Sequence, residues 1–204
     1  MIGDLRRFAP AAARNREAIL EVLRRHLPPR GLVLEIASGS GEHALHFAQN
    51  LGPGIVFQPT DAEADARASI DAWAASAPNV REALALDASA QPWPVAAADA
   101  VVCINMIHIA PWAATLGLMK GAASVLEAGA PLILYGPFRR DGAHTAPSNA
   151  AFDQDLRDRN PAWGVRDLEA VAAVAAENGF GPPAVEPMPA NNLSVIFRRL
   201  ADNH

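Results

Sequence analysis

The chain has little of what marks several classes of protein. Among 204 residues there are one cysteine, one tyrosine and one lysine, Lys120. A lone cysteine cannot form a disulfide within the chain, and Cys103 lies in an apolar run, so we expect it to be buried in a strand. The net charge is −5, and the basic residues are arginines dispersed along the chain. Nucleic-acid binding needs clustered Lys and Arg, so we expect no nucleic-acid partner.

Long apolar runs are also absent. No stretch approaches the ~18 residues that a transmembrane helix needs. The N-terminus lacks the apolar core of a signal peptide. We therefore expect no membrane partner, a cytoplasmic location, and a small molecule or a protein as the substrate. Oligomeric state has no signal in the sequence.

Helical and strand patterns alternate along the chain, and its length fits one domain over 1–204. Repeated β–α units predict a parallel sheet with helices on both faces, and ligands bind beyond the carboxyl ends of its strands. A helical lid is expected over 1–30 and a substrate-side loop insertion over 136–166. The predicted helices are 11–27, 42–49, 62–76, 113–127 and 167–178, with a short one at 149–158. The predicted strands are 32–37, 55–60, 80–86, 99–104, 131–135, 183–188 and 193–199.

A glycine-rich turn joins the first predicted strand to the next helix. Gly39 and Gly41 allow a sharp turn and a close ligand, and the helix N-terminus offers free N–H groups to an anion. The spacing Glu-x-Ala-x-Gly-x-Gly resembles the first motif of S-adenosylmethionine-dependent methyltransferases, in which Glu35 meets the positively charged methionine end. Ala37 and Ser38 belong to the same predicted cofactor site. The alternatives are a tight turn without a ligand and a nicotinamide site, which the missing third glycine and Glu35 disfavour.

Polar residues after the later strands complete the predicted cofactor site. Asp61 ends the second strand, where its carboxylate can accept both ribose hydroxyls or cap a helix. Asp87 and the N–H of Ala88 can meet adenine, although a turn also explains Asp87. Asn105 follows the fourth strand and can hold the amino group of the cofactor or orient an acceptor. Arg14 can pair with the cofactor carboxylate or remain a solvated side chain.

Two residues are candidates for catalysis. His108 is the first choice for a general base, with a buried structural histidine as the alternative. Tyr135, at the end of the fifth strand, is the second candidate. His43 and His46 lie three residues apart on one helix, but no convergent carboxylates or cysteines accompany them, so we expect no metal site.

The acceptor is expected to lie against the segments after strands 4 and 5. A long irregular loop is frequently functional, which favours the 136–166 segment. Its polar and aromatic side chains, and those just before it, could grip an acceptor or only order the loop. The candidate substrate-binding residues are Trp112, Phe138, Asn149, Asp153, Trp163 and Arg166.

Eight segments together resemble the methyltransferase-like protein 26 family. They are FAPAAARN (8–15), LEIASGSGEH (34–43), QPTD (58–61), NMIHIAPW (105–112), YGPF (135–138), SNAAFD (148–153), WGVRD (163–167) and MPANN (188–192). The resemblance implies a Rossmann-like class I methyltransferase: an α/β fold with a seven-stranded, mostly parallel sheet, an antiparallel last strand and helices on both faces. It implies no particular acceptor.

We therefore predict an S-adenosylmethionine-dependent methyltransferase acting on an unidentified small molecule or protein. The alternative is a non-catalytic S-adenosylmethionine-binding sensor or scaffold. Methyl transfer relies on proximity and alignment, and it needs a general base only when the nucleophile arrives protonated.

Overall fold

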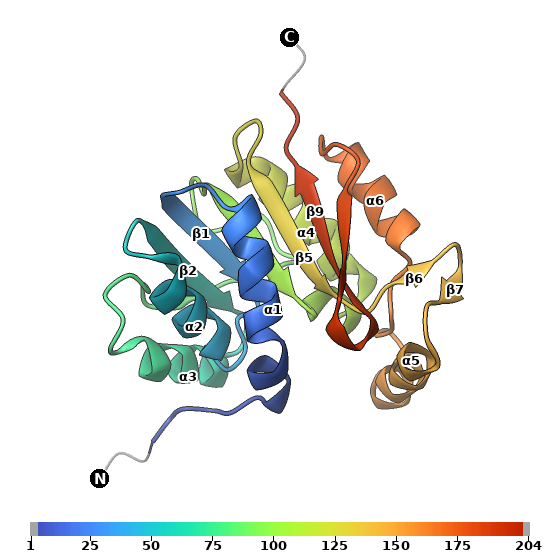
Figure 1. Cartoon of the computed structure of the whole chain (residues 1–204), viewed down its shortest axis with the longest axis horizontal. Coiled ribbons are helices and arrows are strands. Elements are labelled where there is room, and N and C mark those ends of the chain that lie inside the picture. The colour runs from blue at the N-terminus through green and yellow to red at the C-terminus, as the bar shows by residue number, and fades with distance from the viewer. Residues whose placement is uncertain (1–3, 202–204) are drawn as a thin grey trace.

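The computed structural model describes residues 4–201, and a twisted sheet forms its centre (Figure 1). The strands are β1 (Gly31–Ile36), β2 (Ile55–Asp61), β3 (Leu84–Ala85), β4 (Ala100–Ile104), β5 (Pro131–Gly136), β8 (Ala184–Met188) and β9 (Asn192–Arg198). They form a 7-stranded sheet in the order β3-β2-β1-β4-β5-β9-β8. Only β9 runs against the others, because it pairs antiparallel with both β5 and β8. The predicted fold class is confirmed.

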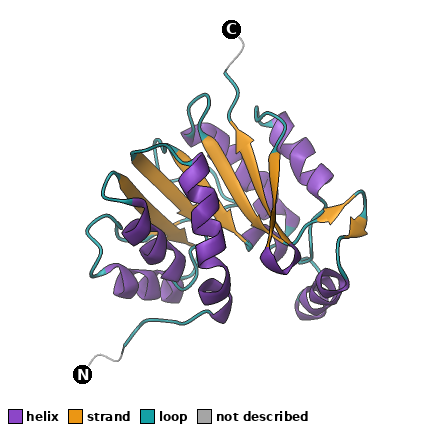
Figure 2. Ribbon diagram, viewed as in Figure 1, coloured by secondary structure: helices purple, strands orange, loops and turns teal. Residues whose placement is uncertain are grey.

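Helices cover both faces of this sheet (Figure 2). The helices are α1 (Pro10–His26), α2 (Glu42–Leu51), α3 (Ala64–Ala74), α4 (Trp112–Val125), α5 (Pro147–Arg159) and α6 (Leu168–Glu177), with the 3₁₀ helices η1 (Met106–His108) and η2 (Pro189–Asn191). α1 and α2 share one core with the sheet residues Val33 and Val102. α4 and α6 share the other with Leu34 and Val101. Neighbouring residues of one strand therefore face opposite cores.

The central strands are apolar because they are buried from both sides. Every residue of β5 is buried, and Cys103 in β4 is buried as predicted. Burial of this kind excludes water from the strands and fixes their carboxyl ends, where the functional candidates lie. Those ends all point toward the same edge of the sheet.

Two predicted segments differ from the structure. The predicted strand 80–86 shrinks to the two-residue β3, preceded by a single bridge between Val80 and Phe57. β3 is one of the two edge strands of the sheet, so it pairs on one side only. The 136–166 segment is more regular than predicted, because it contains α5 and a small hairpin of β6 (Arg139–Arg140) and β7 (Ala143–His144).

The predicted N-terminal lid is the helix α1, which packs on the sheet. An extended segment over residues 4–9, called the strap, precedes it. Residues 1–3 of that lid lie outside the described part of the chain. The strap crosses α3, where Arg7 N–H donates to Ser69 Oγ over 2.8 Å and Phe8 meets the Trp73 ring edge-on. Ala9 N–H donates to the Glu42 carboxylate over 2.6 Å. The strap is thus tied to the helix that follows the glycine turn.

Candidate functional site

The glycine turn after β1 uses left-handed backbone at three positions. Ala37, Gly39 and Gly41 have φ values of 56°, 61° and 92°. A Cβ on Gly41 would lie 2.6 Å from the Cα of Ile70, so this glycine is needed for α3 to pack closely. A Cβ on Gly39 would meet nothing within 4 Å, so the space beside Gly39 is open. Of the two glycines, Gly39 is the one that a ligand can approach.

Asp61 braces this turn from the end of β2. Its Oδ2 accepts the N–H of Gly39 over 3.0 Å, and its Oδ1 accepts the N–H of Glu63 over 3.0 Å. Asp61 is not the N-cap of α3, which is Glu63. Each carboxylate oxygen keeps a second lone pair, so Asp61 can still accept a hydroxyl from a ligand. Ser38 has an internal role, since its Oγ accepts the N–H of Thr60 over 3.2 Å.

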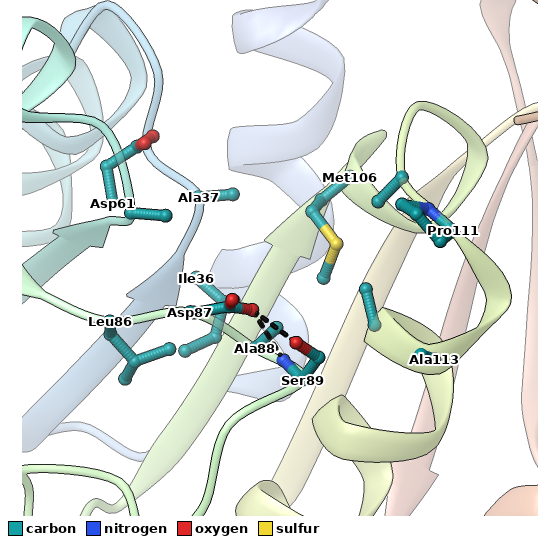
Figure 3. Close-up of a pocket in the computed structure, with 13 residues that line it drawn as sticks. Ile36, Ala37, Asp61, Leu86, Asp87, Ala88, Ser89, Met106, Pro111 and Ala113 are labelled. Atoms are coloured by element: carbon teal, nitrogen blue, oxygen red, sulfur yellow. Dashed lines mark hydrogen bonds between the residues drawn. The ribbon is translucent and has the colours of Figure 1, made fainter. Parts of the chain in front are cut away.

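A cavity of about 280 Å³ opens beside Asp61, at the carboxyl ends of β1, β2 and β3. Figure 3 shows Asp61 and Asp87 across the gap from Met106 and Pro111. The lining of this cavity includes Ile36, Ala37, Asp61, Asp87, Ala88 and Met106. Four of these residues were predicted to bind the cofactor, whereas Ile36 and Met106 were not.

Asp87 and Ala88 present complementary groups to this cavity. Asp87 Oδ1 accepts the N–H and the hydroxyl of Ser89 over 2.8 and 2.7 Å, which forms the turn that Figure 3 marks with dashed lines. Within residues 4–201, Asp87 Oδ2 and the N–H of Ala88 have no hydrogen-bond partner. A free acceptor next to a free donor suits the edge of a heterocycle such as adenine.

Glu35 is buried, and one oxygen of its carboxylate is unpaired within residues 4–201. Its side chain is 2% exposed, and its Oε2 has no partner among the described residues. Burial, assisted by the nearby charge of Asp61, raises the pKa of Glu35 to about 7. An unpaired carboxylate oxygen in an apolar setting is costly, and a positively charged ligand group would remove that cost. Glu35 lines neither the cavity beside Asp61 nor the larger one that lies between α1 and α5, so its role at the methionine end of the cofactor stays a prediction.

A second cavity, of about 580 Å³, lies between α1, β5, α5 and η2. None of the described residues lines both cavities, although Asn105, which lines the larger, directly precedes Met106, which lines the smaller. The lining of the larger cavity holds four predicted site residues, Arg14, Asn105, Tyr135 and Asn149. Arg14 and Asn105, predicted for the cofactor, thus border the larger cavity rather than the nucleoside-sized one.

Tyr135 forms part of the wall of the larger cavity. Its hydroxyl is hydrogen-bonded to the side chains of Asn15 and Asn192, and burial raises the pKa of Tyr135 above its ordinary value of 10. The phenol therefore stays protonated at neutral pH. It can position an acceptor by hydrogen bonding, but it cannot accept a proton there.

The geometry of His108 favours the structural alternative over a general base. His108 is 0% exposed, and its Nδ1 accepts the N–H of Arg166 over 3.1 Å. Burial, with a smaller effect of the Arg166 charge, lowers the pKa of His108 to about 3. Its ring packs edge-on against Phe138 and lines neither cavity. An inaccessible imidazole of this kind does not meet a substrate.

The other predicted substrate residues mostly hold the fold together. Phe138 is 0% exposed in the core, which corrects its predicted contact with substrate. Asp153 accepts the N–H of Val165 over 2.7 Å and pairs with Arg157 and His144. None of the substrate candidates except Asn149 lines the larger cavity.

Arg166 connects its loop to η1 through hydrogen bonds rather than facing a ligand. It donates to the carbonyl oxygens of Ile107, Ala110 and Ala162 over 2.9, 2.6 and 2.9 Å. Its guanidinium also stacks over Trp112 at 5.6 Å. Trp163 is half-buried and lies against Arg159. These contacts order the loop, the alternative that the sequence left open.

Several lining residues of the larger cavity were missed. They are Asn15, Ser148, Phe152, Pro189, Ala190 and Asn192. Three of them belong to the segments FAPAAARN and SNAAFD of the family resemblance, and three belong to MPANN. Those segments contained the signal for a second site, because a hydrophobic core does not require polar residues at these positions.

Solved structures of other proteins share this fold. An O-methyltransferase family protein from Burkholderia thailandensis is 16% identical, with a TM-score of 0.79 over 95% of this chain and 58% of that one. Human N-acetylserotonin methyltransferase, solved with S-adenosylmethionine, is 12% identical, with a TM-score of 0.79 over 94% of this chain and 53% of its own. The chain spans little more than half the length of these two.

The YcgJ protein from Bacillus subtilis matches along its whole length, at 15% identity, with a TM-score of 0.69 over 90% of this chain and 99% of that one. The chain therefore has the methyltransferase fold. Residues 6–199 match the family described as "Protein of unknown function (DUF938)", and the chain belongs to that family. The likeness to the methyltransferase-like protein 26 family stays a resemblance.

Within residues 4–201, every helix is too short or too polar to span a bilayer. No three His, Cys, Asp or Glu side chains in that range converge as metal ligands would.

Proposed function

We propose that this protein is an S-adenosylmethionine-dependent methyltransferase acting on a small-molecule acceptor. The observation that carries the proposal is the presence of two cavities at the carboxyl edge of the sheet. One is sized for a nucleoside and the other for an acceptor; Met106 lines the first, and the preceding residue, Asn105, lines the second. Methyl transfer requires a donor and an acceptor to meet in line, so the proposal requires the methionine part of the cofactor to reach from the smaller cavity toward the larger one.

The groups of the smaller cavity fit the nucleoside part of the cofactor. Asp61 would accept ribose hydroxyls, while Asp87 and Ala88 would meet the adenine edge. Glu35 would face a positive charge of the methionine part. When bound, S-adenosylmethionine supplies a methyl group made electrophilic by its positively charged sulfur.

The larger cavity offers alignment but no proton acceptor. Arg14 and Tyr135 are the only titratable residues of its lining, and both are protonated at neutral pH. A nucleophile must therefore arrive with an available lone pair, as a carboxylate, a neutral amine or a thiolate does. Tyr135 and the surrounding amides would hold and orient it.

Calorimetry with S-adenosylhomocysteine, NAD and ATP tests the cofactor. We expect micromolar binding of S-adenosylhomocysteine and none of NAD. Asp61→Ala should weaken that binding by about 1.5–3 kcal/mol, as for a hydrogen bond to a charged group. Asp65→Ala, on the exposed first turn of α3, is the matched control. Tighter binding of NAD than of S-adenosylhomocysteine would refute the proposal.

A non-catalytic S-adenosylmethionine-binding protein is the second candidate, and the lack of a base in the larger cavity favours it. Incubation with S-adenosylmethionine labelled in the methyl group and a small-molecule extract separates the two. Label in an acceptor indicates an enzyme, whereas tight binding without transfer indicates a sensor or scaffold.

A further inference from the structure

We propose that the larger cavity selects a small acceptor that carries a carboxylate, and that Arg14 is the residue that recognises it. This inference rests on the proposed methyltransferase function and names its substrate class. Arg14 is the only ionised side chain of the lining, which contains no Asp, Glu, Lys or His. Tyr135 is neutral at pH 7, because the ordinary pKa of a tyrosine is about 10 and burial raises the pKa of Tyr135 further. The charge that the wall presents is therefore positive.

Arg14 differs from its neighbours on α1 in having no partner. Arg16 pairs with Glu17 at 3.8 Å, and Arg24 pairs with Glu21. Among residues 4–201, the exposed side chain of Arg14 makes no hydrogen bond or ion pair. A free guanidinium beside a cavity suits a carboxylate, because the planar fork of donors matches the two oxygens.

The N-terminus of α5 adds a hydrogen-bond donor that, like Arg14, favours an anion. Ser148 lies in its first turn and lines the cavity, and its N–H has no acceptor within the described chain. That first turn contains no acidic residue to offset the helix dipole. The start of α1 contributes less, because Glu42 already accepts the N–H of Ala9. Arg14 and α5 therefore favour an anion from different elements of the fold.

The rest of the wall fits a small, partly planar molecule. Asn15, Asn105, Asn149 and Asn192 supply uncharged hydrogen-bonding groups, and Phe152 supplies an apolar surface. The volume of about 580 Å³ lies in the usual range of small-molecule sites. A cationic side chain such as that of lysine would meet no carboxylate here, so a protein amine is disfavoured as the acceptor.

Three probes that share one phenol ring test the selection. They are 4-hydroxybenzoate, 4-hydroxybenzyl alcohol and tyramine, which carry an anionic, a neutral and a cationic substituent. Their affinities are measured by ligand-observed NMR titration, with and without saturating S-adenosylhomocysteine. We expect the benzoate to bind at least about ten-fold more tightly than the other two, as a charge-assisted contact requires. Arg14→Gln should abolish this preference, and Arg24→Gln, on the exposed far end of α1, should retain it.

Several outcomes would overturn the inference. They are equal binding of the three probes, no binding of the benzoate at millimolar concentration, and a preference that survives in Arg14→Gln. If Arg14→Gln weakens S-adenosylhomocysteine but keeps the preference for the benzoate, Arg14 holds the cofactor carboxylate instead. Failure of S-adenosylhomocysteine to bind the unaltered protein would refute the proposed function separately, because the probes are also titrated without it.

Discussion

Glu35→Gln tests whether a buried, incompletely paired carboxylate lies under the glycine turn. The pKa of Glu35 is raised from 4.5 to about 7, chiefly by burial. Between these values the unfolded chain has lost the proton and the folded chain keeps it. Stability therefore falls as the pH rises through this window and stays low above it. At about 1.4 kcal/mol for each pH unit, the loss amounts to about 3 kcal/mol.

The glutamine variant has no such titration, so its stability relative to the parent should rise by about 3 kcal/mol between pH 4.5 and pH 7.5. Urea denaturation at a series of pH values measures this difference. The exposed Glu127→Gln, at the other edge of the sheet, should track the parent protein. A Glu35→Gln difference that does not change with pH would contradict the reasoning.

The same carboxylate should link ligand binding to protons. At pH 6 Glu35 is mostly protonated in the free protein, and the ammonium group of S-adenosylhomocysteine would favour the ionised form. Binding should then release close to one proton. Calorimetry in phosphate and in imidazole, which both take up protons near pH 6, detects the release as a heat that depends on the buffer, and Glu35→Gln should remove that dependence.

Three further predictions concern the surrounding structure. Gly41→Ala should destabilise the fold by at least about 2 kcal/mol in thermal denaturation, because its φ is 92° and the new Cβ would lie 2.6 Å from the Cα of Ile70. Phe138→Ala should cost about 3–5 kcal/mol in urea denaturation while the folded variant still binds S-adenosylhomocysteine, since Phe138 belongs to the core and lines neither cavity. His108→Gln should leave the pH profile of single-turnover methyl transfer unchanged near neutrality, because the pKa of about 3 keeps His108 uncharged there; loss of a titration near pH 7 would restore it as the base.

The fold was predictable because its main signals are local. The run around β4 is apolar and short, and glycines and prolines mark the ends of the helices. The edge strand β3 was overestimated because Val80 is apolar, yet only Leu84 and Ala85 continue the ladder with β2. α5 was only partly visible, since it buries few of its residues and has little apolar periodicity.

Residues of the candidate site were predictable where the direction of a strand alone brings them to a cavity. They were not predictable where the direction of the side chain decides whether a residue reaches a cavity. Asp61, Asp87 and Ala88 lie beside the smaller cavity because every parallel strand ends at the same edge. Phe138 and Asn149 both follow β5, but Phe138 turns into the core and Asn149 toward the larger cavity. Position in a loop does not reveal which way a side chain points.

The antiparallel strand explains the remaining omission. A parallel strand brings its last residues to the ligand edge of the sheet, whereas β9 runs the other way and brings its first. Asn192 begins β9 and pairs with Met188, so η2 turns at that edge. Asn192 therefore joins Tyr135, which ends β5, although 57 positions separate them in the sequence. The residues of this wall lie after β8 and up to the first residue of β9, so the ends of the first five predicted strands alone do not include them.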